Sequence, residues 1–333
     1  MTAWPSTLGI GLEGREPLAT IPDLARAAEA GGAGTLWVAS HLFLRDPVTA
    51  AHVALAATTR LRVALMAVSP YAMHPVHLAM SAAALDELFP GRVILCLGTG
   101  APADREAAGI EAPSPVVALR EAILACRGLL AGEAVKLEGR FFRFGGQRAL
   151  VNGATRVPVI LAAARPGTLR LAGAVADGVL LSGAASRPYV RRCLEIVGDA
   201  AAGRPVARLG LVLAAAVPPD GGRAGGRDAA LADTRRRLAF ILRGEHHSEN
   251  LALAGSVLDR PRLYDLSLAG DWDAAAAMVT DDVVARHAAA GTPEEIAAAV
   301  ADYRDAGLDE VVLSNLGDAD AVRHTLHAAG SRA

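Results

Sequence analysis

The sequence is poor in several residue types, and each shortage excludes a class of protein. Aromatic residues make up only 4% of the 333 residues, and Lys136 is the only lysine among 33 basic residues. These basic residues are matched by 35 acidic ones, which gives a formal net charge of −2. Because there is no basic excess to neutralise a phosphate backbone, we expect no nucleic-acid partner.

Cysteine is also scarce. The three cysteines, Cys96, Cys126 and Cys193, are far apart and form no Cys-x-x-Cys pair. This excludes a disulfide framework and suits a reducing cytoplasm. The first residues show no basic segment followed by an apolar one, and no run of about 18 uncharged apolar residues occurs. We therefore expect a cytoplasmic protein without a membrane span.

What the chain does contain is apolar residues, led by alanine. Hydrophobic residues make up 52% and charged residues 20%, and the mean hydropathy is +0.31. Such a composition excludes disorder, and its small side chains predict helices packed tightly against a sheet. The length suits one α/β barrel of about 250 residues plus insertions.

Short apolar runs alternate with longer amphipathic stretches, which predicts strands alternating with helices. The runs are nearly continuous rather than alternating, as expected for strands buried on both faces. About eight such βα units predict an α/β fold of the (β/α)₈ TIM-barrel type, and a doubly wound open sheet is the alternative. The expected strands are 8–12, 35–39, 61–68, 92–97, 157–162, 178–182, 206–217 and 310–314.

The expected helices fill the intervals between these strands. Thr20 is the expected N-cap of the first helix, and Thr292 with Glu295 forms a capping box at the start of a later one. Residues 229–290 are expected to be mostly helical. The other helices are expected at 21–31, 47–58, 76–88, 115–130, 167–176, 188–201, 294–306 and 319–329.

Two stretches break the rhythm. Residues 133–146 contain three of the six phenylalanines and predict an inserted hairpin. Residues 221–226, Gly-Gly-Arg-Ala-Gly-Gly, predict a flexible loop. Neither stretch marks a domain boundary. We therefore expect a single domain over 1–333, with insertions at about 133–148 and 221–290.

Two glycine-rich or small-residue turns follow expected strands, where a barrel places its active site. Gly98 to Ala103 fits G-x-G-x-x-A, but it follows the fourth strand, contains Pro102 and lacks the later acid of a dinucleotide site. Its glycines still let backbone N–H groups approach a phosphate closely. Residues 162–167 lead into a helix N-terminus and predict a second anion cradle, although barrel loops often carry glycine for structural reasons alone.

Several histidines are candidates for chemistry. His41 follows the second strand, where a lone histidine is more often a structural hydrogen-bond partner than a catalyst. His74 and His77 are three residues apart but have no carboxylate close in sequence, so we expect no metal site. Whether His246 and His247 face substrate or solvent is left open by the sequence.

Stretches along nearly the whole chain resemble the bacterial luciferase-like family, in the same order. They include Leu36 to His41, Ser69 to Tyr71, Leu97 to Gly100 and Gly291 to Glu295. Within the family, the chain is most similar to the methylenetetrahydromethanopterin reductases of its F420-dependent branch. The resemblance implies a (β/α)₈ barrel and the deazaflavin coenzyme F420 as cofactor. FMN is the alternative, because sequence separates the two branches poorly.

The resemblance also implies a set of site residues. A non-prolyl cis peptide between Met66 and Ala67 is expected to form a bulge behind the deazaflavin ring. Ser69 matches a residue that hydrogen-bonds the coenzyme, and His41 matches one at the reacting end of the ring. The cofactor-binding residues implied in this way are Ser40, Met66, Ala67, Ser69, Gly98, Thr99, Gly100, Ala164, Arg165, Gly167 and Thr168.

Three carboxylates of the methanopterin enzymes are missing. Gly11, Ser40 and Ala101 stand where those enzymes have acids, so we expect His41 to lack an adjacent carboxylate. Glu13 and Asp104 are nearby acids that can take over, and we predict His41 and Glu13 as the catalytic residues. The residues that match the family's cofactor contacts are therefore present, whereas the acids expected on the substrate side are replaced.

The expected activity is hydride transfer between F420 and a small organic substrate, most plausibly at a C=N or activated C=C bond. An FMN-dependent monooxygenase of the same fold is the first alternative, and a non-catalytic ligand-binding barrel is the second. We expect a homodimer.

Overall fold

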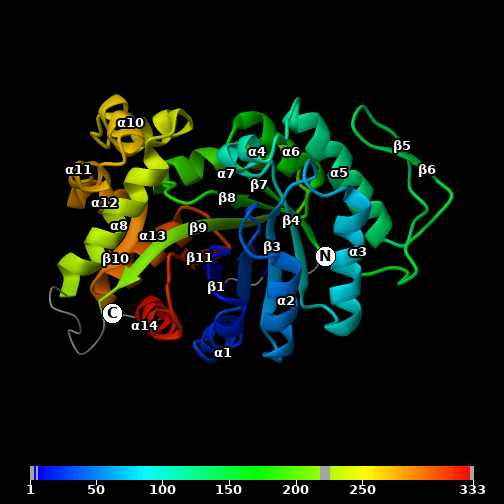
Figure 1. The fold of residues 1–333 in the computed structure, drawn as a ribbon, viewed down its shortest axis with the longest axis horizontal. Helices are drawn as coiled ribbons and strands as arrows, with labels where there is room; N and C mark the ends of the chain where they lie inside the picture. Colours follow the sequence, from blue (N-terminus) through cyan, green and yellow to red (C-terminus); the bar gives the residue numbers. More distant parts are fainter. Residues whose placement is uncertain (1–3, 5–6, 218–225, 331–333) are drawn as a thin grey trace.

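The computed structural model describes residues 4, 7–217 and 226–330. Eight parallel strands close into a barrel (Figure 1), in the order β1, β2, β3, β4, β7, β8, β9, β11 and back to β1. The TIM-barrel prediction is confirmed, and the open doubly wound sheet is wrong. The barrel strands are β1 Thr7–Leu12, β2 Thr35–Ala39, β3 Arg62–Val68, β4 Val93–Leu97, β7 Val159–Ala163, β8 Gly178–Leu181, β9 Ala207–Ala216 and β11 Glu310–Ser314.

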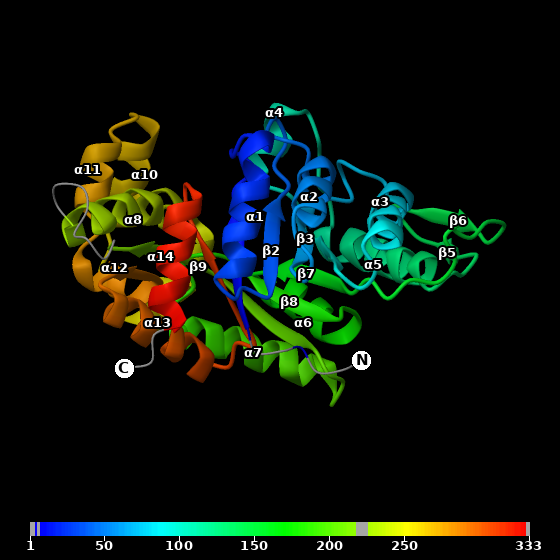
Figure 2. The same cartoon turned by 90° about the horizontal axis from the view of Figure 1, so that it is seen from below.

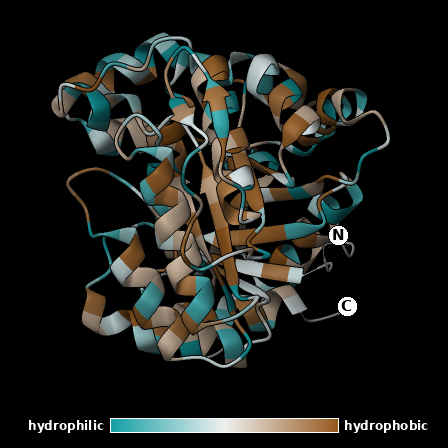
Figure 3. Cartoon of the chain, turned by 90° about the vertical axis from the view of Figure 1, so that its right-hand side faces the viewer, coloured by the Kyte–Doolittle hydropathy of each residue, from teal (hydrophilic) through white to brown (hydrophobic). Residues whose placement is uncertain are grey.

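Helices cover the outside of the barrel, and their inner faces are rich in alanine. In α3, for example, Ala79, Ala82 and Ala83 are fully buried, which lets the helix pack closely on the sheet. Figure 3 shows mostly hydrophobic strands surrounded by helices that carry hydrophilic stripes. These helices are α1 Ile21–Ala30, α2 Pro47–Ala56, α3 Pro75–Leu88, α5 Pro115–Leu130, α6 Pro166–Val175, α7 Arg187–Ala201, α13 Pro293–Asp305 and α14 Ala319–Gly330.

The two capping predictions have different outcomes. At α13, the Thr292 hydroxyl accepts the Glu295 N–H and the Glu295 carboxylate accepts the Thr292 N–H, so the capping box is confirmed. At α1, Thr20 is the N-cap residue, as predicted, but its side chain makes no cap hydrogen bond. A 3₁₀ turn, η1 Leu18–Thr20, leads into α1, and the Thr20 hydroxyl donates to the carbonyl of Pro17 at 2.9 Å instead.

Strand β9 extends beyond the barrel and carries a ninth strand. Its first part pairs with β8 and β11, and its last residues, 213–216, pair with β10 Ala288–Gly291. The expectation of helix through residue 290 is therefore wrong at this end. Without a neighbouring strand, the extension of β9 would leave backbone N–H and C=O groups unpaired. Residues 288–291 pair with it and satisfy these groups.

The long insertion packs on this extension. Its helices surround a separate hydrophobic cluster that includes Leu213 of β9, Leu238 and Val284. Residues 221–225 of the expected flexible loop lie outside the described residues, and Gly226 begins a helix. The helices are α8 Gly226–Leu242, η2 Glu245–His247, α9 Ser248–Ala254, α10 Arg260–Leu268, α11 Trp272–Ala277 and α12 Asp281–His287.

The expected hairpin is present as β5 Lys136–Glu138 and β6 Arg143–Gly145, which pair antiparallel. It is anchored by Glu121 of α5, whose carboxylate accepts the backbone N–H groups of residues 140, 141 and 142. Figures 1 and 2 place this hairpin and the helices α10 and α11 at opposite ends of the long axis. Of the two insertions, the helical one contributes a residue, His246, to the cavity described below, and residues 133–148 contribute none to its described lining.

Candidate active site

A cavity of about 590 Å³ opens at the C-terminal ends of the strands. This strand-end cavity lies where barrel enzymes bind their substrates. A larger cavity of about 720 Å³ lies at the N-terminal ends, around Arg62, Val93 and Asp177, where barrel residues serve stability. The strand-end cavity is lined by Ala39, Ser40, His41, Met66, Ala67, Gly98, Thr99, Gly100, Ala101, Pro102, Arg105, Ala112, Pro115, Ala162, Ala163, Ala164, Arg165, Thr168, Leu180, Leu181, Ser182, Leu211 and His246.

One wall of the cavity is the bulge in β3. The Met66–Ala67 peptide bond is cis, as predicted, and the register between β3 and β4 shifts at this point. The bulge is held on both sides, because the Ser40 N–H donates to the Met66 carbonyl at 2.5 Å and the Gly98 N–H donates to the Val68 carbonyl at 3.0 Å. A Cβ at position 98 would lie 2.8 Å from the Ala67 Cβ, so glycine is required there.

The glycine turn after β4 forms the next part of the wall. Gly100 has φ of +76°, a conformation that side-chain-bearing residues rarely adopt. Ser69 supports the turn from behind, since its hydroxyl donates to the Thr99 carbonyl at 3.1 Å. Ser69 does not line the strand-end cavity but an adjoining small hollow that it shares with Asp104. Its predicted direct contact with the coenzyme is untested, and the structure gives it a supporting position.

A short helix that was not expected follows this turn. It is α4 Pro102–Ala107, and it brings Arg105 to the cavity wall. Pro102 at its first position and Asp104 in its first turn are ordinary helix-start signals that would have identified it. Nε of Arg105 is buried and has no hydrogen-bond partner among the described residues. A buried guanidinium N–H beside a glycine turn fits an anionic group such as a phosphate.

The start of α6 forms another part of the cavity wall, and the anion cradle expected there stays a prediction. Ala164, Arg165 and Thr168 line the cavity, and the Ala164 carbonyl accepts the buried hydroxyl of Tyr189 at 2.6 Å. Gly167 faces away from the described wall. A Cβ there would lie 3.1 Å from Cγ2 of Val116, so this glycine allows close packing of α6 on α5.

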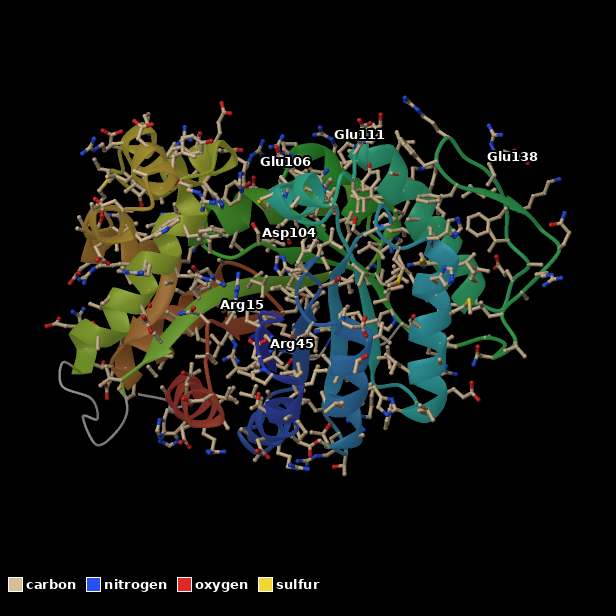
Figure 4. The ribbon with its side chains drawn as sticks, in the orientation of Figure 1. Arg15, Arg45, Asp104, Glu106, Glu111 and Glu138 are labelled. Carbon is tan, nitrogen blue, oxygen red and sulfur yellow. The ribbon has the colours of Figure 1, made fainter. Side chains whose placement is uncertain are left out.

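His41 has a carboxylate partner, contrary to the expectation from Ser40. Its Nδ1 lies 3.0 Å from Oδ2 of Asp104, and both side chains are partly exposed. Figure 4 shows Asp104 on the side of α4 nearer the strands and Glu106 on its outer side. The expectation that His41 lacks a neighbouring carboxylate is wrong, and the acid beside it is Asp104, one of the two acids that the sequence offered as replacements. The contact forms because α4 brings Asp104 to the residue that follows the end of β2.

Glu13, the other predicted catalytic residue, has a different role in the structure. Its carboxylate pairs with the guanidinium of Arg237 on α8, and its backbone N–H donates to Glu16 at 2.8 Å. It is absent from the described lining of the strand-end cavity. This ion pair ties the loop after β1 to the insertion.

Two neighbouring histidines of the insertion, His246 and His247, differ in how far they are buried. His246 lines the cavity, whereas His247 is only 4% exposed. Burial lowers the pKa of His247 to about 3, with further lowering by His246 and His287. Burial also lowers the pKa of His246, helped by the nearby charges of Arg165 and Arg260. Both rings are therefore neutral at pH 7.

Two kinds of feature are absent from the described part of the chain. Residues 4, 7–217 and 226–330 contain no group of three or more His, Cys, Asp or Glu side chains placed to hold a metal ion. Within the same ranges, every helix is too short or too polar to cross a bilayer.

Comparisons with known proteins agree with this geometry. Residues 2–310 match the family described as luciferase-like monooxygenase. The chain is 30% identical to the 5,10-methylenetetrahydromethanopterin reductase of Methanolobus tindarius, over 92% of this chain and 93% of that protein. It is 29% identical to the F420-dependent glucose-6-phosphate dehydrogenase of Nakamurella multipartita, over 68% and 70%.

A solved structure shows the same fold. The coenzyme F420-dependent tetrahydromethanopterin reductase of Methanopyrus kandleri superposes with a TM-score of 0.86. The match covers 98% of each chain at 22% sequence identity.

Proposed function

Because the chain belongs to the luciferase-like monooxygenase family, we propose that it is an F420-dependent oxidoreductase acting on a small organic substrate. Its relatives named above are F420-dependent reductases and dehydrogenases, which supports the oxidoreductase class. The reaction we propose is hydride transfer at a C=N or activated C=C bond. One observation carries the proposal: the bulge of β3, the Gly98–Gly100 turn and the start of α6 share one cavity with His41.

The residues of this cavity fit a phosphate-bearing deazaflavin. Gly100 presents its backbone without a Cβ, Arg105 offers an unpartnered buried N–H, and the hydroxyl of Thr168 lies at the start of α6. Together they form a cradle for an anion. When bound, F420 supplies the ring carbon that donates or accepts the hydride.

The other lining residues serve positioning and exclusion of water. Leu180, Leu181 and Leu211 are apolar and come from β8 and β9. An apolar wall keeps water from the reacting atoms and strengthens the polar interactions that remain. Because the strands are fixed by the barrel, a ligand held by this wall keeps one orientation.

His41 and Asp104 handle the proton that accompanies hydride transfer. The Asp104 carboxylate accepts a hydrogen bond from Nδ1 of His41, which leaves Nε2 of the neutral ring free to accept a proton when the substrate is oxidised. In the reverse direction, Nε2 gives that proton back from the imidazolium. In this arrangement His41 is the catalytic residue and Asp104 is a positioning residue.

A pair of titrations tests the proposal. Purified protein is titrated with F420 and, separately, with FMN, by fluorescence and visible absorbance. We expect F420 to bind at least about tenfold more tightly, a difference of about 1.4 kcal/mol. Reduced F420 should then be oxidised in the presence of an acceptor from a panel of imines and activated alkenes.

The alternatives have distinct outcomes. Tighter binding of FMN, with oxygen consumption, would make the protein an FMN-dependent monooxygenase. Binding of F420 without turnover of any hydride donor or acceptor would favour a non-catalytic barrel. The Gly100→Val variant described in the Discussion reports whether binding occurs at the proposed cradle.

A further inference from the structure

His246 is the one contribution of the helical insertion to the described lining of the strand-end cavity. It lies in η2, between α8 and α9, and it is exposed on the cavity side. Arg165, at the start of α6, lines the same cavity, and its positive charge acts on the His246 ring. Residue 165 follows β7. His41 stands at the end of β2, and β3 and β4 separate these two strands in the barrel.

A buried polar network lies directly behind His246. The ring of His246 contacts that of His247, with centroids 4.2 Å apart and planes tilted by 43°. Nδ2 of Asn250 donates to the carbonyl of Ala184 at 2.7 Å and contacts Nδ1 of His247 at 3.4 Å. Oδ1 of Asn250 accepts the Ser186 N–H at 2.9 Å, which sets the orientation of the amide. The contact with His247 therefore has the ring nitrogen as acceptor, in agreement with a neutral ring.

A second histidine completes this network. Nδ1 of His287 lies 2.9 Å from the carbonyl of Ala184, and its Nε2 lies 2.9 Å from the Ser256 hydroxyl. Since a carbonyl only accepts, Nδ1 of His287 donates and its Nε2 accepts in the neutral ring. The loop after β8 is thus joined to α9 and α12. His246 contacts this network through the ring of His247.

The charges around His246 select one kind of ligand group. Arg105 and Arg165 line the cavity, and no carboxylate does so among the described residues. Arg260 adds a third positive charge near His246. Asp104, in the adjoining hollow, is already paired with His41. An imidazole N–H beside an arginine therefore faces a positive field and an acceptor oxygen is the matching partner.

We propose that His246 and Arg165 together bind an oxyanion group, a carboxylate or phosphate, on the organic substrate. His246 is then the residue through which the insertion sets substrate specificity. The inference rests on the proposed function, because it keeps the Gly98–Gly100 turn, Arg105 and Thr168 for the cofactor. It revises one residue of the family resemblance: the side chain of Arg165, which the resemblance gives to the cofactor, is assigned with His246 to the substrate. An acidic group of the cofactor tail has the same chemistry, so the experiment separates these two sources.

The experiment uses matched pairs of ligands that differ only in charge. Benzoate and benzamide, and cinnamate and cinnamamide, are titrated calorimetrically into the F420-loaded protein at constant ionic strength. We expect each carboxylate to bind about tenfold more tightly than its amide. His246→Ala should remove most of that preference, and His246→Gln should restore part of it because its amide N–H can donate. The F420 dissociation constant should stay within about twofold in both variants.

Controls and contrary outcomes complete the design. His77→Ala, an exposed histidine on α3, should leave the preference unchanged. Equal binding or no binding of both members of each pair by the unmodified protein would overturn the proposal. So would a His246→Ala variant that loses F420 affinity and keeps the carboxylate preference, since the corner would then belong to the cofactor tail. The same titrations without F420 separate a failure of this inference from a failure of the proposed function. If the protein binds no F420 but still prefers carboxylates, and His246→Ala removes that preference, only the proposed function is rejected.

Discussion

Nδ1 of His41 lies 3.0 Å from Oδ2 of Asp104, although 63 positions separate the two residues in the chain. The family resemblance predicts that His41 lacks a carboxylate next to it in the chain, because position 40 is a serine. In the structure, α4 brings a carboxylate to His41 from elsewhere in the chain. Four expected outcomes test this arrangement and the cavity around it.

Asp104→Asn should slow the reaction more than it weakens binding. The amide keeps the shape of the side chain but loses the charged acceptor that orients the His41 ring. We expect turnover to fall roughly 10- to 100-fold, less than for complete loss of a proton donor. Steady-state kinetics and F420 titration measure the two effects separately.

The matched control for Asp104 is Glu106→Gln on the same helix, where Glu106 is exposed on the outer side (Figure 4). It should leave turnover unchanged, and Asp104→Glu should restore part of the activity lost in Asp104→Asn. An Asp104→Asn enzyme with full turnover would show that the pair is incidental to catalysis.

His41→Ala should lower turnover by ~10²–10⁴-fold, the usual contribution of a general acid or base. Cofactor binding should weaken much less, because the bulge of β3 and the cradle are untouched. Single-turnover oxidation of reduced F420 is the appropriate measurement. If only the unfolding temperature changed, His41 would be a structural histidine.

Gly100→Val should weaken F420 binding by at least about tenfold. A Cβ on a residue with φ of +76° strains the turn and blocks the close approach of a phosphate. Gly109→Val is the control, because Gly109 also has positive φ, but a Cβ there would meet no other atom within 4 Å and the residue has no place in the cavity wall. Equal F420 affinity in the two variants would place the cradle elsewhere.

Stability should fall in acid because of the buried histidines of the insertion. Burial lowers the pKa of His247 to about 3 and also lowers that of His287. Unfolded histidine titrates near 6.5, so between that pH and the folded pKa the unfolded chain binds more protons. The free energy of unfolding then decreases as pH falls below about 6.5, by up to about 1.4 kcal/mol per pH unit for each such group.

Urea unfolding between pH 7.5 and pH 4.5 measures this slope. His247→Gln should reduce it, and His77→Ala should leave it unchanged, since His77 is exposed. A slope that His247→Gln does not alter would mean that other groups govern the acid response.

The sequence by itself determined the barrel and identified part of the wall of the strand-end cavity. Continuous apolar runs such as 93–97 and 310–314 carry the strand signal, because a strand buried on both faces needs apolar residues at every position. Gly98 and Gly100 indicated close backbone approaches, since only glycine tolerates them. The cis bond after Met66 followed from family resemblance and is present.

Only the tertiary structure decided which polar side chains meet. Asp104 reaches His41, and Glu13 pairs with Arg237 more than 200 positions away, because of how α4 and α8 pack on the barrel. The spacing of hydrophobic residues indicates which face of a helix or strand is buried. It does not indicate which residue, distant in the sequence, lies opposite a given polar side chain. The same reason kept the cavity position of His246 open, since it depends on how β9 extends and where the insertion packs on it.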